Sequence, residues 1–369
     1  MLAAARMHDV EIAIVGAGIS GLVAVHQLIR AGLQVVVLEA GSQPGGRVRS
    51  ARGPAGQVIG DLGPTWVWPE SQPIAAAWIE RLGLETFAQF EDGQAIVELD
   101  RARPPVTTML PRQDGSLRLV GGTQALIDRL VAGLPAQTIV TSAAVTGIDA
   151  RAASLRISLG DARPPIAARG VVVAVPPRIA MRDLVWQPAL PPALAAALAA
   201  TPTWMALHAK AVIHYARPFW RERGLSGRIA SRVGPMVEVH DHGGPHGEPA
   251  ALFGFIGWPA QVRKELGAKL ADHVAAQLVH CFGSDAPAPL SITIEDWAAD
   301  PWVAVAADLA GDGSHPEVRP GVLRQAHLDG RVWFAAAETA ELSPGLIEGA
   351  MAAGERAGAA AARTFGDRR

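Results

Sequence analysis

Residues 14–22 read IVGAGISGL and place Gly16, Gly18 and Gly21 in the spacing G-x-G-x-x-G. The apolar run EIAIV before them predicts a buried parallel strand, and SGLVAVHQLIRAG after them has the apolar spacing of a helix. The next run, LQVVVLEA, predicts a second buried strand that ends in Glu39. The stretch therefore predicts a β-α-β unit with glycines in its first turn.

Each glycine has a physical role in such a turn. Gly16 permits the tight turn, Gly18 lets the backbone approach a pyrophosphate, and Gly21 lets the helix pack against the strand. The N-terminus of the helix attracts phosphate charge. Glu39 lies eighteen residues after Gly21, where a carboxylate binds ribose hydroxyls. The pattern predicts a dinucleotide site, and the alternative is an empty structural turn.

The composition excludes several classes of protein. The 369 residues suffice for two domains, and a net charge of −2 gives no reason to expect a nucleic-acid or membrane-surface partner. The single cysteine, Cys281, excludes an intrachain disulfide. The first eleven residues lack a long apolar run, and prolines interrupt the longest one, so we expect neither a secretory signal nor a membrane span. We expect a cytoplasmic protein.

A second glycine pair favours a flavin over a nicotinamide. The run LEAGSQPGGR adds Gly45, Gly46 and Arg47, and a guanidinium beside a pyrophosphate would neutralise it. The whole block resembles the N-terminus of the flavin-containing amine oxidase family, hhhGAGhSGL…LEA…GGR, where h is apolar. The preference for FAD depends mainly on this resemblance.

The resemblance continues in order along the chain. DLGPTWVWP (61–69) is similar to the family's segment near the flavin ring, VTSAAVTGI to the strand at the adenine end, and GVVVAVPPRIA, a buried strand, to the family's VVAxPP segment. RVWFAAAETAELSPGLIEGAMAAGERAG (331–358) resembles the closing block, whose helix N-terminus faces the flavin pyrimidine edge. The cofactor-binding residues that the resemblance implies are Gly16, Gly18, Ile19, Ser20, Gly21, Glu39, Ala40, Gly45, Gly46, Arg47, Gly63, Pro64, Thr65, Trp66, Val145, Trp297, Glu338, Leu346 and Ile347.

The run HAKAVIHYARPFW (208–220) resembles the family's strand with one buried lysine, here Lys210, followed eight residues later by Pro-Phe-Trp. The resemblance implies that Lys210 holds a water against flavin N5 and assists reaction with oxygen. The alternative is an edge-strand lysine that points to solvent.

Two family features are missing. The segment after Trp297 has no cysteine, so we expect non-covalent FAD. The family commonly has a pair of tyrosines facing the flavin, and the matching positions here are Ala307 and Leu346. These two residues and Trp302 are the candidates for the substrate pocket. The run EVHDHGGPHGEP (238–249) gathers metal-ligand types, but we interpret it as a loop bordering the cavity and expect no metal.

The resemblance implies an α/β and α+β fold in which the chain crosses between two domains. A Rossmann-like FAD-binding domain would comprise residues 1–72, 111–199 and 300–369, and a mixed-sheet and helix substrate domain residues 73–110 and 200–299. The implied activity is FAD-dependent oxidation of an amine, with hydride transfer from the C–H next to nitrogen to flavin N5 and reoxidation by O2 to H2O2. The substrate is a small amine or apolar molecule. The alternatives are a desaturase or dehydrogenase acting on a C–C bond and a non-catalytic flavin-binding accessory protein.

Overall fold

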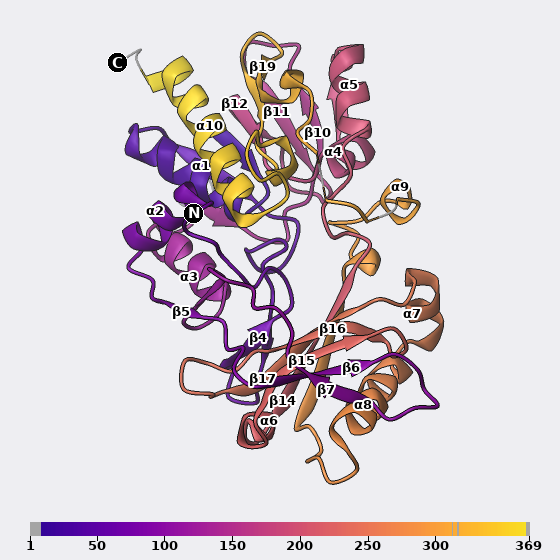
Figure 1. Ribbon diagram of the computed structural model, residues 1–369. Coiled ribbons are helices and arrows are strands. Elements are labelled where there is room, and N and C mark those ends of the chain that lie inside the picture. Colours follow the sequence, from indigo (N-terminus) through magenta and orange to yellow (C-terminus); the bar gives the residue numbers. More distant parts are fainter. Residues whose placement is uncertain (1–8, 312, 316, 367–369) are drawn as a thin grey trace.

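The computed structural model describes residues 9–311, 313–315 and 317–366. The chain forms two lobes, each built around one sheet (Figure 1). The upper lobe carries the longest helix, and the chain passes between the lobes more than once. This confirms the expected α/β and α+β fold.

The upper lobe contains a nine-stranded sheet whose centre is parallel. β1 pairs in parallel with β2 on one side and with β12 on the other, and its run of buried apolar residues is the pattern of a strand covered on both faces. The strands of this sheet are β1 (Asp9–Val15), β2 (Val35–Leu38), β9 (Ile139–Val140), β10 (Val145–Asp149), β11 (Leu155–Leu159), β12 (Ile166–Val173), β13 (Val185–Gln187), β19 (Ala326–His327) and β20 (Val332–Phe334).

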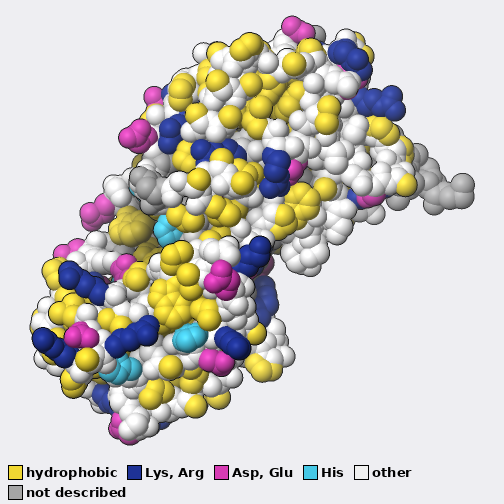
Figure 2. All heavy atoms as spheres, turned by 90° about the vertical axis from the view of Figure 1, so that its right-hand side faces the viewer, with side chains coloured by type: hydrophobic (Ala, Val, Ile, Leu, Met, Phe, Trp, Pro, Cys, Tyr) yellow, Lys and Arg dark blue, Asp and Glu magenta, His cyan; other side chains and the backbone are white. Residues whose placement is uncertain are grey.

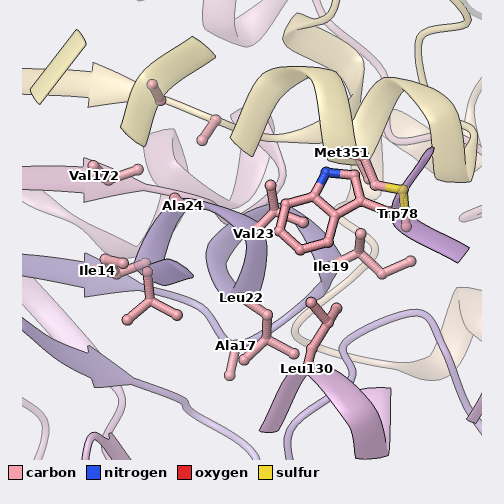
Figure 3. Close-up of a cluster of buried hydrophobic side chains, with 14 of the residues drawn as sticks. Ile14, Ala17, Ile19, Leu22, Val23, Ala24, Trp78, Leu130, Val172 and Met351 are labelled. Carbon is pink, nitrogen blue, oxygen red and sulfur yellow. The ribbon is translucent and has the colours of Figure 1, made fainter. Parts of the chain in front are cut away.

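Helices cover both faces of this sheet. On one face α1 packs against α10 so closely that a Cβ at Gly354 would lie 2.3 Å from the carbonyl oxygen of Ser20. Trp78 and Met351 complete this core over Leu22 and Leu130 (Figure 3). The helices of this lobe are α1 (Ile19–Arg30), α2 (Pro73–Arg81), α3 (Gln124–Ala132), α4 (Pro177–Asp183), α5 (Pro192–Ala199) and α10 (Ile347–Phe365).

The lower lobe contains a seven-stranded, mostly antiparallel sheet. β14 lies inside it, between β18 and β17, so Lys210 is not on an edge strand. One face of the sheet packs on the apolar side of α8. The strands are β6 (Gln94–Glu98), β7 (Val106–Thr108), β14 (Ala209–Tyr215), β15 (Leu225–Ser231), β16 (Met236–Asp241), β17 (Ala250–Ile256) and β18 (Ser291–Asp296), and the helices are α6 (Phe219–Glu222), α7 (Ala260–Leu266) and α8 (Lys269–Phe282).

Short elements connect the two lobes. The hairpin of β3 (Ser50–Arg52) and β4 (Val58–Asp61) packs its apolar side chains on β14 and β17. The others are the pair β5 (Thr86–Ala88) and β8 (Leu117–Leu119), the helix α9 (Ala306–Leu309) and the 3-10 turn η2 (Trp297–Ala299). The 3-10 turns η3 (Gly321–Arg324) and η4 (Ala337–Thr339) belong to the upper lobe, where they pack on α5 and on α10.

The structure differs from the sequence-based expectation in two places. Residues 73–81 were expected in the substrate domain, but α2 packs against α10 in the upper lobe, because Trp78 is buried there and its Nε1 donates to Glu355. For the run PAQVRKELGAKLADHVAAQLVHCFG (259–283) we expect one helix of the substrate domain. These residues form α7 and α8, because Gly267 adopts φ 53° and ends the first.

No helix in the described part of the chain combines the length and the apolar character that crossing a membrane requires. On the face shown in Figure 2, acidic and basic side chains are interspersed over both lobes, as a net charge of −2 leads one to expect.

Candidate functional site: a cavity between the glycine turn and a buried lysine

A cavity of about 1240 Å³ runs from the end of β1 in the upper lobe to β14 in the lower lobe. All the cofactor-binding residues implied by the sequence line this cavity, except Gly21 and Glu338. Lys210 and Trp302 line it too. Tertiary folding thus brings together segments that are more than three hundred residues apart in the sequence, including Gly16 and Ile347.

The glycine turn has the geometry that its spacing predicts. Gly16 adopts φ 101°, which residues with a side chain rarely do, and a Cβ on Gly21 would lie 2.0 Å from the carbonyl oxygen of Gly16. By contrast, the nearest atom to a Cβ on Gly18 is 4.0 Å away, so this glycine leaves space on the cavity side. Gly46 approaches it from the second turn at φ 57°. The two turns form a narrow backbone-lined cradle at one end of the cavity.

Glu39 is fixed at the same end of the cavity. Its carboxylate accepts hydrogen bonds of 2.7 Å from the backbone N–H of Ala17 and from that of Gly41. The side chain is half-buried and lines the cavity, where its oxygens can also accept from ribose hydroxyls.

Arg47 lines the cavity, as the sequence implied, whereas Glu338 does not line it and is bound to Arg47. Arg47 donates to both carboxylate oxygens of Glu338, at 2.5 and 3.1 Å, and its partner is fully buried. The same pair binds the backbone of Trp204 at both its N–H and its C=O. Arg47 therefore already has a counter-charge, and Glu338 holds Arg47 and the turn at Trp204 instead of lining the cavity.

The other end of the cavity holds Lys210, which is 3% exposed. Its Nζ donates to the carbonyl of Gly63 at 2.9 Å and to Oγ1 of Thr65, and lies 4.0 Å from the ring centre of Phe253. Burial, opposed by the charge of Asp61, lowers the pKa of Lys210 to about 7. A buried amine that can change its charge near neutral pH thus faces the cavity.

Aromatic side chains surround this end. Trp66, Trp68, Phe255 and Trp302 line the cavity, and Nε1 of Trp66 is held by Gln89. Leu346 lines it at the start of α10. Ala307 does not: it lies on a separate cavity of about 200 Å³, although the sequence alignment placed it in the substrate pocket.

Several wall residues had no signal in the sequence. Trp204, Met205 and His208 come from the segment that enters the lower lobe, and Met205 adopts φ 60° there. Arg49 lies at the wall and is bound by Glu295 and Asp300. Only the crossing of the chain places these residues on the cavity.

The histidine-rich run does not border the cavity, contrary to expectation, and only its first residues, 238–241, belong to a strand, whereas 242–249 form the connection after it. Residues 236–241 form β16, and His240, Asp241 and His242 are 0–1% exposed and lie behind the cavity wall. No group of metal-ligand residues with suitable geometry occurs among the described residues.

The cavity fits a flavin dinucleotide. It has a backbone cradle at which a side chain on Gly21 or Gly16 would clash, a carboxylate placed for the ribose, and a wide aromatic end. Its two ends are joined in a single space, as a dinucleotide requires.

Comparisons with known proteins agree with this geometry. The chain matches the family described as flavin containing amine oxidoreductase over residues 19–113 and 107–362. It is 24% identical to putrescine oxidase of Kocuria rosea over 95% of both proteins, and 24% identical to a putative flavin-containing monoamine oxidase of Mycobacterium tuberculosis over 95% of this chain and 96% of the relative. The first alignment runs over 475 positions, so that relative carries internal segments that this chain lacks.

Solved structures share the fold. Putrescine oxidase bound to putrescine superposes with a TM-score of 0.76, at 20% identity, over 95% of this chain and 98% of that one. Cyclohexylamine oxidase from Brevibacterium oxydans gives a TM-score of 0.78, at 19% identity, over 97% and 99%. Since the family match extends over most of the sequence, the chain belongs to the flavin containing amine oxidoreductase family and is a flavin-dependent oxidoreductase.

Proposed function

We propose that this protein binds FAD without a covalent link and oxidises an amine, with oxygen as the electron acceptor. Bound FAD would supply the redox chemistry, taking a hydride from the C–H next to the nitrogen and passing the electrons to O2 to give H2O2. We propose a cytoplasmic location, which the single cysteine, Cys281, is compatible with.

One observation carries the proposal: a single cavity joins the glycine cradle to the buried amine of Lys210. A positive charge in an apolar wall stabilises negative charge that develops next to it, which favours electron transfer to oxygen. Lys210 is held at this wall by two neutral acceptors, the carbonyl of Gly63 and the hydroxyl of Thr65, so its charge is not cancelled by a direct ion pair.

The wall also favours the reactive form of the substrate. An amine is oxidised as the neutral base, and an apolar surface such as Trp66, Phe255 and Trp302 disfavours the ammonium ion. Among the carboxylates on this wall, Asp300 is bound by Arg49 and by the backbone N–H of Trp302. A substrate nitrogen therefore meets aromatic rings rather than this anion.

A second candidate, oxidation of a C–C bond, is favoured by one observation. The chain's single tyrosine, Tyr215, is buried among Phe219 and Trp220 in the lower lobe, and Ala307 lies outside the cavity. A tyrosine pair that would orient an amine nitrogen is thus absent from the described wall. The wall would then bind an apolar molecule with no nitrogen.

The test is the visible spectrum of the purified protein, followed without oxygen as primary amines, secondary amines, polyamines and amino acids are added. We expect a flavin band that one class of amine bleaches, and H2O2 when air is admitted. A flavin band that no amine bleaches would favour C–C oxidation. A protein that takes up no FAD would contradict both proposals.

A further inference from the structure

Both hydrogen-bond acceptors of Lys210 lie in a segment that begins with a buried carboxylate, Asp61. Asp61 is 1% exposed, and its Oδ1 accepts from the backbone N–H of Thr123 at 2.9 Å and from the Thr123 hydroxyl at 3.0 Å. The same hydroxyl lies 3.0 Å from the carbonyl of Pro64. Asp61 and Thr123 thus fix the segment 61–65, which carries both acceptors of Lys210.

A neutral histidine closes the other side of Asp61. Nε2 of His242 accepts the backbone N–H of Asp61 at 2.7 Å, so the ring proton is on Nδ1. Burial, together with the charge of Arg118, lowers the pKa of His242 to about 3. The space is tight, since a Cβ on Gly60 would lie 2.4 Å from the His242 ring. His242 therefore shapes the pocket of Asp61 and adds no charge to it.

The charges around Lys210 leave Asp61 as its main anion. On β18 the residue opposite Lys210 is Glu295, which is bound by Arg49. On β17 the opposite residue is the apolar Phe255. Arg118, at β8, is buried, donates to the carbonyls of His242 and Gly243, and lowers the pKa of Lys210.

We propose that Asp61 is a positioning residue for Lys210: its buried carboxylate holds the acceptors of the lysine in place and keeps the amine charged toward the cavity. His242, directly after β16, then forms the back wall of the Asp61 pocket. The inference rests on the lysine-lined cavity of the proposed function, and neither an amine substrate nor oxygen enters its argument.

The composition makes a direct test possible. The chain has three lysines, Lys210, Lys264 and Lys269, and the last two are exposed. With ¹³Cε-labelled lysine, the NMR signal that titrates far below the other two reports Lys210, and Lys210→Met identifies it by loss. We expect Asp61→Asn to lower the Lys210 titration midpoint by about one pH unit or more, because it removes the buried anion whose charge raises the pKa of Lys210.

Asp61→Asn removes the charge but keeps an oxygen for Thr123, whereas Thr123→Val removes the hydroxyl bond and keeps the charge. We expect Thr123→Val to move the midpoint much less. Asp128→Asn is the matched control, because Asp128 is an exposed carboxylate on the same cavity that is bound by Gln124. A midpoint that Asp61→Asn leaves unmoved, or that Asp128→Asn lowers equally, would overturn the inference.

Arg118→Gln removes a positive charge near Lys210, so it should move the midpoint in the opposite direction from Asp61→Asn. This variant keeps the inference testable if Asp61→Asn does not fold. It should raise the midpoint, and a fall or no change would contradict the charge balance. The pH dependence of reoxidation by oxygen should shift in step with the NMR midpoint. If NMR shifts and reoxidation does not, Asp61 acts as inferred and the oxygen role of Lys210 in the proposed function is wrong.

Discussion

Burial of a charged side chain costs desolvation free energy, and two such side chains, Lys210 and Asp61, lie at one end of the cavity. Lys210 has no solvent to stabilise its ammonium, and its partners Gly63 and Thr65 are neutral. Burial opposes the charge of Asp61, whereas the charges of Lys210 and Arg118 favour its carboxylate and lower its pKa. The charge of each of these residues thus influences the pKa of the others.

The pKa of Lys210 predicts how stability changes with pH. Because the folded pKa is about 7 and the reference value is 10.5, the unfolded chain binds more protons between these values, and folding becomes more favourable as the pH rises through that window. We expect Lys210→Met to be more stable than the wild type at pH 6–7 and to lose this advantage, at most about 5 kcal/mol, as the pH approaches 10. Urea unfolding of both proteins at several pH values measures this difference in the free energy of unfolding. An advantage that is constant with pH would mean that Lys210 titrates normally.

Among the elements, the close pair α1 and α10 aligns the cradle. The N-terminus of α1 faces the glycine turn, and α10 starts at the aromatic end of the cavity. Gly354 and Gly358 let the two helices touch, since Cβ atoms there would lie 2.3 and 2.9 Å from carbonyl oxygens of α1. This packing transmits any displacement of α10 to the turn beneath α1.

We expect Gly354→Ala to be destabilising, although alanine normally gains about 1 kcal/mol over glycine in a helix. Steric overlap with Ser20 is larger than this gain, because forcing extra volume into a packed contact costs about 1–3 kcal/mol. Thermal melting and FAD content should both fall. Gly366→Ala is the control, because a Cβ there meets nothing within 4 Å. A stabilised Gly354→Ala would show that the helices separate without cost.

At the scale of the molecule, the pair Arg47–Glu338 joins three distant segments. It connects the second glycine turn, the segment before α10 and the backbone of Trp204, at the point where the chain enters the lower lobe. Glu338 has no exposed surface, so its charge depends on Arg47 alone among the side chains bound to it. The Arg47–Glu338 pair therefore holds the segment that leads to Lys210 next to the glycine cradle.

Breaking this pair from one side should be costly. We expect Arg47→Met to lower the free energy of unfolding by about 3–5 kcal/mol, because it leaves a buried carboxylate unpaired. The double variant Arg47→Met/Glu338→Leu should be less destabilised than the sum of the two single changes, since it removes both charges. Urea unfolding of the wild type, Arg47→Met, Glu338→Leu and the double variant gives the coupling free energy between the two side chains. Additive losses would show that the two side chains act independently.

Sequence alone determined the β-α-β unit, because glycine spacing, strand periodicity and Glu39 are local features that backbone geometry requires. The family resemblance correctly indicated the fold, and it named residues that the structure gathers on one cavity. Local pattern could not show that β16 is a buried strand, because Asp241 meets Arg221, and His240 meets Trp66 and Phe253, only in the folded chain.

Tertiary structure also decided which charges are free. The Arg47 guanidinium is neutralised by a residue 291 positions away, and the acceptors of Lys210 come from 145 and 147 positions away. The sequence alignment predicted Ala307 in the substrate pocket, whereas the fold places it on a separate cavity. Burial and pairing are properties of contacts between distant segments, so the sequence indicated most of the residues that line the cavity, and only the fold determined the charge that each one presents.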